Sequence, residues 1–362
     1  MKKMELLQYL RRQGHISAHA SFRIVPLSGG NLNQIYLFQN NSKKNSQNSS
    51  ASFVLKQGLT KAKIKIPFTL PPERVLMEKK ALELIRKRTH SQSIPKIIFF
   101  DENKSLLAME AVAPSFRLLT YELLQGKVNY GLVKNLANFY ASLHNATYAH
   151  ISLKTEFYSK ELFKKSKIGC YHEELYRSLA DKNIQRQIKE TITKSYRNEI
   201  ALIHGDAQPK NILVKGDKFY ILDWEVAHYG DPAYDLGCLM AHYLLSGIIN
   251  FPLRSHYYTA IELFFREYER KCNFKKIFPK VLLNAFQHFA PILFGRVVGT
   301  YKILFINKKT RLCTLKIVGR LLRESPLTLS AFFKIVEEEG KELINNQPFS
   351  ENEIQNIGSR LF

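Results

Sequence analysis

In the first third of the chain, short apolar runs alternate with polar turns, and only one segment has helical spacing. In that segment, residues 73–87, one helical face collects Val75, Glu78, Leu82 and Ile85. The apolar runs are short enough to be strands: 22–27, 34–38, 53–56, 96–100 and 106–109. The polar stretch 40–52, rich in Asn, Ser and Lys, is expected to be a loop between two of them. This order predicts a small α+β unit.

Beyond residue 118 the pattern changes, and helical periodicity dominates. One helical face there collects Leu132, Leu136, Phe139, Tyr140 and Leu143. The clear β signal of this half is 211–223, where two apolar runs flank a Lys-Gly-Asp turn and predict a hairpin. We therefore expect an N-terminal unit, 1–112, and a larger, mainly helical C-terminal unit, 113–362.

The segment 204–211, His-Gly-Asp-Ala-Gln-Pro-Lys-Asn, carries the strongest chemical signal. Asp206 is followed five residues later by Asn211, then by the expected hairpin and Asp223. Phosphoryl transfer requires a carboxylate that orients the attacking hydroxyl and oxygen ligands that hold Mg²⁺ on the phosphates. The spacing predicts Asp206 as the base and Asn211 with Asp223 as the metal ligands. A plain turn formed by Asp206 and Asn211 is the alternative, but it leaves the hairpin and Asp223 unexplained.

These residues, together with Leu222–Gly237 (LDWEVAHYGDPAYDLG), resemble the aminoglycoside phosphotransferase and choline kinase superfamily. The shared signatures are HGDxxPxN and GDPxxDL, over roughly 35 residues. The resemblance implies a two-lobed protein-kinase-like fold, with a small β-rich N-lobe and a larger, mainly helical C-lobe. It also implies that ATP and Mg²⁺ bind between the lobes, and that the γ-phosphate passes to a hydroxyl of a small molecule.

Three short segments are similar to the methylthioribose kinase branch of this superfamily: Ser28–Asn33 (SGGNLN), Leu55–Gln57 (LKQ) and Asp223–Glu225 (DWE). The chain departs from that branch at Asn211, where its members tend to have Ser, and at Asp231-Pro232. By the same resemblance, Glu225 is a second metal contact or substrate-side residue; the alternative is a surface residue.

In the N-terminal unit, the resemblance implies that the phosphates are approached by the backbone of Ser28, Gly29, Gly30 and Asn31. Lys56 ends a strand where kinases place the lysine that pairs with these phosphates. An ordinary hairpin turn and a solvent-facing lysine are the alternatives. Glu78 favours the kinase interpretation, because a carboxylate on an apolar helix face needs a partner and Lys56 is the natural one.

The segment 107–112 is expected to connect the lobes and to hold adenine. By its order along the chain, Met109 lies beside the adenine, and Glu110 and Val112 offer main-chain contacts. In the C-terminal unit, Asp231-Pro232 is a helix-start signal. The resemblance implies that Asp235 ties the catalytic loop to that helix, and His204 is expected to be a buried histidine that holds the loop.

The acceptor is expected to be small, because only about a dozen residues separate Asp223 from Asp235, too few for a peptide-docking segment. Residues 251–323 contain 15 Lys or Arg and three acids. A basic environment favours a neutral or anionic acceptor, such as a sugar or phosphorylated metabolite, over a polycation. Arg296 interrupts an apolar run and either faces the acceptor as an anion-binding residue or snorkels to the helix edge.

The net charge of +23 arises from 54 basic and 31 acidic residues spread along the whole chain. Solvated lysine-rich surfaces explain this charge, and binding to nucleic acid is the alternative. Four cysteines with no paired spacing, no long apolar run and no signal-like start predict a cytoplasmic protein that does not enter a membrane. Other open functions are an aminoglycoside-modifying enzyme and a catalytically weak nucleotide-binding protein. The choice of ATP over GTP and the oligomeric state are left open.

Overall fold

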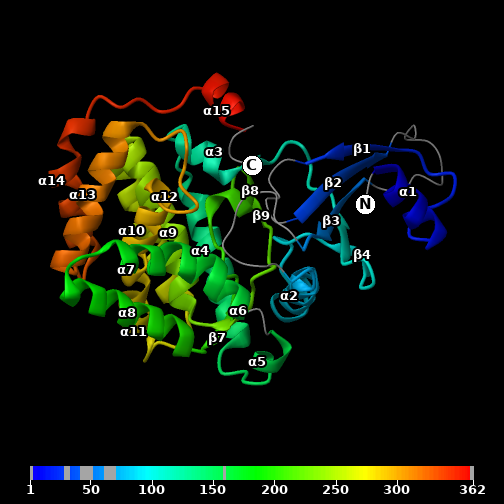
Figure 1. The fold of residues 1–362 in the computed structure, drawn as a ribbon, viewed down its shortest axis with the longest axis horizontal. Helices are drawn as coiled ribbons and strands as arrows, with labels where there is room; N and C mark the ends of the chain where they lie inside the picture. The colour runs from blue at the N-terminus through cyan, green and yellow to red at the C-terminus, as the bar shows by residue number, and fades with distance from the viewer. Residues whose placement is uncertain (1–2, 28–32, 41–51, 61–70, 158–159, 359–362) are drawn as a thin grey trace.

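The computed structural model describes residues 3–27, 33–40, 52–60, 71–157 and 160–358. Its N-terminal region is built on one antiparallel sheet with the strand order β1-β2-β3-β5-β4 (Figure 1). The strands are β1 (Phe22–Pro26), β2 (Asn33–Asn40), β3 (Phe53–Gly58), β4 (Ile97–Asp101) and β5 (Leu106–Glu110). All five of the runs expected from sequence are therefore strands, with ends that differ by a few residues.

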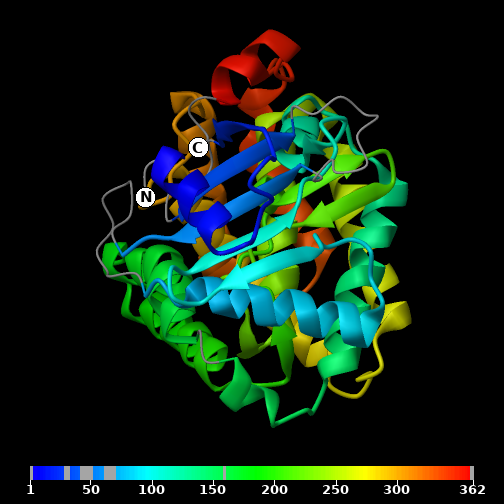
Figure 2. The same ribbon diagram turned by 90° about the vertical axis from the view of Figure 1, so that its right-hand side faces the viewer.

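One helix covers each face of this sheet, as the side view shows (Figure 2). Helix α1 (Lys3–Arg12), which the sequence pattern did not predict, buries Leu6 and Leu10 against Phe38 and Phe53. Helix α2 (Arg74–Thr89) is the predicted helix, and its apolar stripe packs into the main core that extends into the helical region. The sheet is thus held from both sides, and only α2 faces the rest of the molecule.

The rest of the chain is mainly helical. It contains α3 (Leu119–Leu124), α4 (Tyr130–Thr147), α5 (Leu153–Glu156), α6 (Lys160–Phe163), the π-helix η1 (Lys164–Glu173), α7 (Glu174–Ser178), α8 (Lys182–Arg197), η2 (Pro209–Asn211), α9 (Pro232–Ile249), η3 (Phe251–Leu253), α10 (Arg254–Lys271), α11 (Phe278–Gln287), α12 (Phe289–Val297), α13 (Lys308–Glu324), α14 (Leu329–Gly340), η4 (Lys341–Leu343) and α15 (Glu351–Gly358).

Helix α9 is the centre of this helical region, because it is buried along its whole length. It packs against α10, α11 and α12, and α4 packs against α10. The five apolar residues predicted for one face of α4 are all buried there. Asp231 begins α9 as its N-cap and accepts a hydrogen bond from the Ala233 backbone N–H, which confirms the predicted helix start.

The helical region also contains more β structure than the sequence indicated. The predicted hairpin is present as β8 (Ile212–Lys215) and β9 (Lys218–Ile221), extended by β6 (Arg117–Leu118). A second pair, β7 (Ala201–Ile203) and β10 (His228–Gly230), was missed. Strands of two or three residues are too short for alternation to show, so periodicity alone does not reveal them.

All four cysteines are buried free thiols. None of the described helices is, by itself, long and apolar enough to cross a membrane. Helix α9 and the segment Phe251–Lys271 reach that length and apolarity only as a pair, bent by 117°.

Candidate active site

The segment predicted to be the catalytic loop follows β7 and folds around the carboxylate of Asp206, which is 4% exposed. The Asn211 side-chain amide donates to Asp206 Oδ2 at 3.1 Å and to its backbone carbonyl at 3.0 Å. Gln208 Nε2 donates to Asp206 Oδ1 at 2.6 Å. Because the Asn211 nitrogen is engaged in this way, its side-chain oxygen is left to accept from another group or to bind a cation.

Asp223 is brought to the same place by backbone contacts around Leu222. The Leu222 N–H donates to the Asn211 carbonyl at 2.8 Å, and His204 Nε2 bonds to the Leu222 carbonyl at 2.9 Å. Asp223 itself has φ +68°, a left-handed conformation, and 32% of its side chain is exposed. The predicted convergence of Asp206, Asn211 and Asp223 is therefore present, and Asp223 is the member that solvent reaches.

His204 and Asp235 hold the loop that carries Asp206 through hydrogen bonds to its backbone, as expected for both residues. His204 is buried, and its Nδ1 accepts from the Asp206 backbone N–H at 3.1 Å. The Asp235 carboxylate accepts from the backbone N–H groups of His204 at 2.7 Å and Gly205 at 2.9 Å. Asp235 also lies in the first turn of α9, where the helix dipole favours negative charge.

Lys56, on β3, lies at the centre of a cluster of carboxylates. Its Nζ is 2.5 Å from Glu78 Oε2 and 3.5 Å from Glu225 Oε2, and it also pairs with Asp223. The Lys56–Glu78 pair is the one that the apolar stripe of α2 predicted, and the solvent-facing lysine is ruled out because Lys56 is buried.

The charges of this cluster shift one another's pKa values. Burial opposes the charge of Lys56, but Asp223, Glu225 and Glu78 outweigh it and raise the pKa of the lysine. Burial raises the pKa of Glu78 to about 7, with Lys56 opposing the shift and the neighbouring carboxylates adding to it. Burial likewise opposes ionisation of Asp223, but Lys56 outweighs it and lowers the pKa of that carboxyl.

Glu225 is buried, so the surface alternative for this residue is wrong. Arg74 Nε pairs with Glu225 Oε2 at 3.1 Å, and Asn33 Nδ2 donates to the same oxygen at 2.7 Å. Arg74 also donates to Asn33 Oδ1 at 2.8 Å. Sequence reasoning missed Arg74, because an arginine in the first turn of a helix beside a Pro-Pro pair gave no signal of a buried role. It included Asn33 in the Ser28–Asn33 segment but gave this residue no role of its own.

Lys167 was also missed, although it lies 2.8 Å from Asp206 Oδ1 and is itself buried. It comes from η1, whose π-helical winding no local pattern revealed. Burial opposes the charge of Asp206, but Lys167 and Lys210 outweigh it and hold the pKa of this carboxyl well below its usual range. Asp206 is therefore ionised at neutral pH.

Arg296, on α12, is half-buried and donates from Nη1 to the Tyr301 carbonyl at 2.7 Å. It also acts electrostatically on Lys210, so it lies on the Asp206 side of the helical region. Snorkelling to bulk solvent does not describe this side chain.

Of the residues expected at the nucleotide, Met109 is buried at the end of β5, and the Glu110 N–H donates to the Lys96 carbonyl at 2.8 Å. Val112 follows the strand, half-buried, and within the described ranges its backbone N–H has no hydrogen-bond partner. The expected loop residues Ser28, Gly29, Gly30 and Asn31 lie outside the described residues, as does most of the 40–52 loop.

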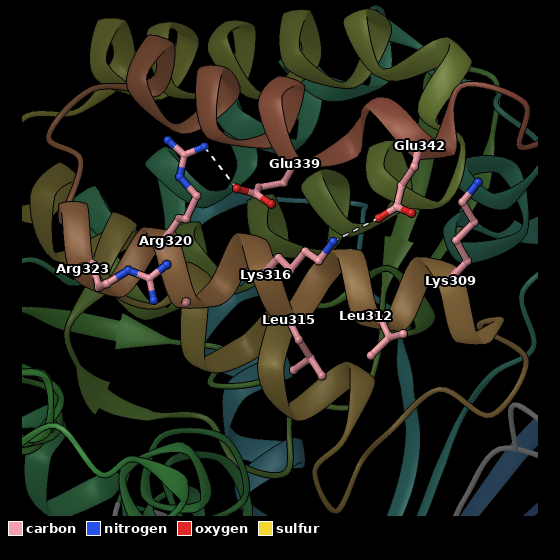
Figure 3. A pocket seen from close by; sticks show the side chains of 9 residues that line it. Lys309, Leu312, Leu315, Lys316, Arg320, Arg323, Glu339 and Glu342 are labelled. Atoms are coloured by element: carbon pink, nitrogen blue, oxygen red, sulfur yellow. Dashed lines mark hydrogen bonds and ion pairs between the residues drawn. The ribbon is translucent and has the colours of Figure 1, made fainter.

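A hollow of about 560 Å³ lies elsewhere, between α13 and the segment formed by α14 and η4 (Figure 3). Its charges are largely paired: Arg320 with Glu339 at 3.3 Å, and Lys316 with Glu342 at 3.4 Å. It contains none of the residues around Asp206 or Lys56, and we do not regard it as the active site. A second hollow, of about 520 Å³, borders the β8–β9 turn and is equally separate from those carboxylates.

A small lobe with a buried Lys–Glu pair, set on a helical lobe with an Asp-Asn-Asp constellation, defines a phosphotransferase of the kinase-like fold. The model of the phosphotransferase enzyme family matches residues 23–251, and the chain belongs to this family. The two-lobed α+β class predicted from sequence is confirmed, and the protein is an enzyme of the small-molecule kinase class.

Known relatives share limited sequence with the chain. Methylthioribose kinase of Bacillus cereus (strain AH820) is 22% identical over 273 residues, covering 68% of this chain and 67% of that protein. Methylthioribose kinase 2 of Oryza sativa subsp. japonica is 22% identical over 277 residues, and the match spans 68% of this chain and 63% of that protein. Among solved structures, an amicoumacin kinase in complex with AMP-PNP, Ca²⁺ and Ami aligns with TM-score 0.56 and 12% identity, covering 92% of this chain and 97% of that one.

Proposed function

We propose that this enzyme transfers the γ-phosphate of ATP to a hydroxyl group of a small, sugar-like molecule. The observation that carries the proposal is the convergence of Asp206, Asn211 and Asp223, with Lys56 paired to Glu78 beside them. The names of the methylthioribose kinase relatives support a sugar-like acceptor.

In this proposal Asp206 faces the acceptor hydroxyl, accepts its hydrogen bond and directs the oxygen at the phosphorus. Its pKa is held low, so it is a weak base in the ground state. A weak base suffices, because the transition state is loose and the hydroxyl loses its proton only as the new bond forms. Asn211 and Gln208 keep the carboxylate in one orientation throughout.

Asn211 and Asp223 fit a magnesium ion. The Asn211 oxygen is left available by the bonds of its nitrogen, Asp223 is an ionised and partly exposed carboxylate, and both are the hard oxygen donors that Mg²⁺ prefers. The described residues hold no group of three or more His, Cys, Asp or Glu arranged for a metal, so phosphate oxygens and water would supply the remaining ligands. When bound, Mg²⁺ neutralises charge on the phosphates.

Lys56 is proposed to pair with the nucleotide phosphates, and Glu78 to hold it in place. Glu225 is proposed to support this pair through Lys56 and Arg74 rather than to contact the acceptor, because its Oε2 is already shared by Asn33, Arg74 and Lys56. Met109 and the backbone of Glu110 and Val112 are proposed to bind adenine, supported by the unpartnered Val112 N–H. The backbone of residues 28–31 is also proposed to bind the nucleotide phosphates.

We also propose that residues 1–112 and 113–362 act as the two lobes and that the enzyme works in the cytoplasm, which the four free buried thiols support. An aminoglycoside acceptor is disfavoured, because a polycation would meet the positive charges of Lys167, Lys210 and Arg296 beside Asp206.

The test is acceptor-dependent release of ADP from MgATP across a panel of sugars, methylthioribose and aminoglycosides. We expect a sugar-like compound to be phosphorylated and Asp206→Asn to slow its turnover by at least about 10²-fold. Nucleotide binding without transfer to any acceptor would instead favour a catalytically weak binding protein. Tight, steeply salt-dependent binding to DNA or RNA would favour the nucleic-acid alternative.

A further inference from the structure

Three cations from separate segments lie near Asp206: Lys167 and Lys210 act electrostatically on this carboxylate, and Arg296 acts on Lys210. Lys167 comes from η1, Lys210 from η2 and Arg296 from α12. Only Lys167 pairs with Asp206, at 2.8 Å. Within the part of the chain that the structure describes, Lys210 and Arg296 have no carboxylate within ion-pair distance. At full ionisation this group of four side chains carries an excess of two positive charges.

The unused donors of this group belong to Arg296 and Lys210. Arg296 is anchored by its bond to the Tyr301 carbonyl, and its buried Nε has no partner among the described residues. Lys210 is half-buried and likewise makes no hydrogen bond with any described residue. A buried donor without a partner is unfavourable, so Arg296 Nε is suited to bind an anion, and the unpaired ammonium of Lys210 adds positive charge beside it.

The cation group lies on the helical side of Asp206, opposite the sheet. Lys56 and Glu78 reach the site from β3 and α2, whereas Lys167 and Arg296 come from η1 and α12. The close approach of these two helices depends on Gly295, because a Cβ there would lie 2.2 Å from Tyr171 Cδ1. The glycine therefore brings the neighbouring Arg296 toward the loop that carries Asp206.

Two aromatic rings line the same side. The Tyr171 and Tyr301 rings are 5.7 Å apart, and Lys167 Nζ lies 5.7 Å from the Tyr301 ring centroid. Tyr171 is buried, so of these two rings only the half-buried Tyr301 offers an apolar face against which the carbon skeleton of a small polyol can pack. The cations and this ring together describe a site for a compact molecule that bears negative charge.

We infer that the acceptor is an anionic polyol, whose phosphate or carboxylate group is bound by Arg296 and Lys210 while its hydroxyl faces Asp206. This inference rests on the proposed kinase function and specifies its acceptor. Arg296 presents a planar fork of donors that matches phosphate and carboxylate oxygens. Lys167 keeps Asp206 ionised and adds to the attraction for the anion. The nucleotide phosphates have their own lysine, Lys56, on the other side.

The experiment compares matched probes: ribose, ribose 5-phosphate and ribonate, with inorganic phosphate as a fragment. Binding to the full chain is measured by calorimetry in the presence of MgADP, and turnover by ADP release from MgATP. We expect at least one charged sugar to bind roughly tenfold or more tightly than ribose. Comparing the affinities for ribose 5-phosphate and ribonate shows whether the site prefers a phosphate or a carboxylate.

Variants then locate the site. Arg296→Gln should weaken binding of the charged probe by roughly tenfold or more, while MgADP affinity stays within about twofold of wild type. Arg266→Gln, at an exposed arginine of α10, is the matched control and should change neither. If Arg296→Gln weakens MgADP as much as the sugar phosphate, the cations serve the nucleotide and the inference is overturned.

Two further outcomes overturn it: ribose binding as tightly as its charged derivatives, and no Arg296-dependent binding of any charged probe, inorganic phosphate included. Failure of the proposed function looks different, because the wild-type chain would then bind no MgADP and release no ADP with any acceptor.

Discussion

Two charged clusters meet at this site, and they differ in sign. Around Lys56, two cations (Lys56 and Arg74) face three carboxylates (Glu78, Asp223 and Glu225), which leaves an excess of negative charge. Around Asp206, the three cations described above face one carboxylate. The negative excess of the first cluster favours a cation beside Asp223, its partly exposed carboxylate, and the positive excess of the second favours an anion. Charge of either sign is thus concentrated where a ligand of the opposite sign is expected.

The clusters also differ in where their residues come from. The Lys56 cluster joins β3 and α2 of the sheet region to the loop after β9, so it depends on how the two regions meet. The Asp206 cluster is built entirely within the helical region. Substitutions in the first cluster should therefore act on the nucleotide, and substitutions in the second on the acceptor and the transfer step.

The sharpest way to separate the clusters is Asp206→Asn, which keeps the shape of the side chain and removes its charge. We expect kcat to fall by about 10²–10⁴-fold, because the acceptor hydroxyl loses its proton acceptor. The affinity for MgATP should stay within about threefold of wild type, since Lys56 and Asp223 are untouched. Stopped-flow binding of a fluorescent ATP analogue and steady-state turnover measure the two effects. Asp217→Asn, in the exposed β8–β9 turn, is the control; turnover within tenfold of wild type in Asp206→Asn would remove this role.

Unlike Asp206→Asn, Lys56→Met should act mainly on nucleotide binding. The change leaves three carboxylates with only Arg74 as a cation, and removing one partner of a buried, hydrogen-bonded pair costs roughly 2–5 kcal/mol. We expect the dissociation constant for MgATP to rise by at least about 30-fold. Lys79→Met, at a partly exposed lysine of α2 that pairs with Glu83, is the control and should leave the dissociation constant for MgATP unchanged. A normal MgATP affinity in Lys56→Met would show that the cluster is structural only.

Asp235→Ala should lower the stability of the loop that carries Asp206, and it should not act selectively on either cluster. It removes the acceptor of two buried backbone N–H groups, at His204 and Gly205. Unpaired buried donors of this kind cost about 1–3 kcal/mol each, so we expect the free energy of unfolding to fall by roughly 2–4 kcal/mol. Urea denaturation measures the loss. Asp235→Asn should recover part of it, and equal stability of Asp235→Ala and wild type would contradict the assignment.

Acid should destabilise the helical region through four buried histidines, His172, His228, His242 and His288. Burial lowers the pKa of each, to about 4 for His228 and about 3 for His242 and His288. Between the unfolded value near 6.5 and these values, the unfolded state binds more protons, so stability falls as pH falls. At pH 5.5 the loss is roughly 1 kcal/mol per histidine relative to pH 7.5.

The effect of Glu78 on the pH dependence of stability has the opposite sign, because its pKa of about 7 in the folded protein lies above its ordinary value of 4.5. The folded state binds the extra proton between these values, so Glu78 adds stability as pH falls through 7. Glu78→Gln should therefore steepen the acid loss measured by urea denaturation at pH 7.5 and 5.5. A pH dependence identical to that of wild type would show that Glu78 does not titrate in this window.

Sequence reasoning reached the residues that local patterns encode. The spacing of Asp206, Asn211 and Asp223 predicts one loop followed by one hairpin. The apolar stripe of α2 predicts that Glu78 is buried. Lys167 and Arg74 carry no such pattern, because each meets its partner only through tertiary contacts. The π-helical winding of η1 and the packing of α12 against it are decided by the core, which periodicity does not describe. The strands β7 and β10 were missed for the related reason that three residues show no period.

The left-handed backbone of Asp223 has a consequence for how this enzyme can lose its activity. Glycine adopts φ +68° without the strain of about 1 kcal/mol that a side chain imposes there. Asp223→Gly would therefore relieve the backbone, while Lys56 keeps Glu78 and Glu225 as partners. It would also break the Lys56–Asp223 ion pair, so the strain relieved and the pair lost act on stability in opposite directions. A descendant that had ceased to catalyse would give up this carboxylate at a net cost in stability smaller than the loss of the ion pair alone.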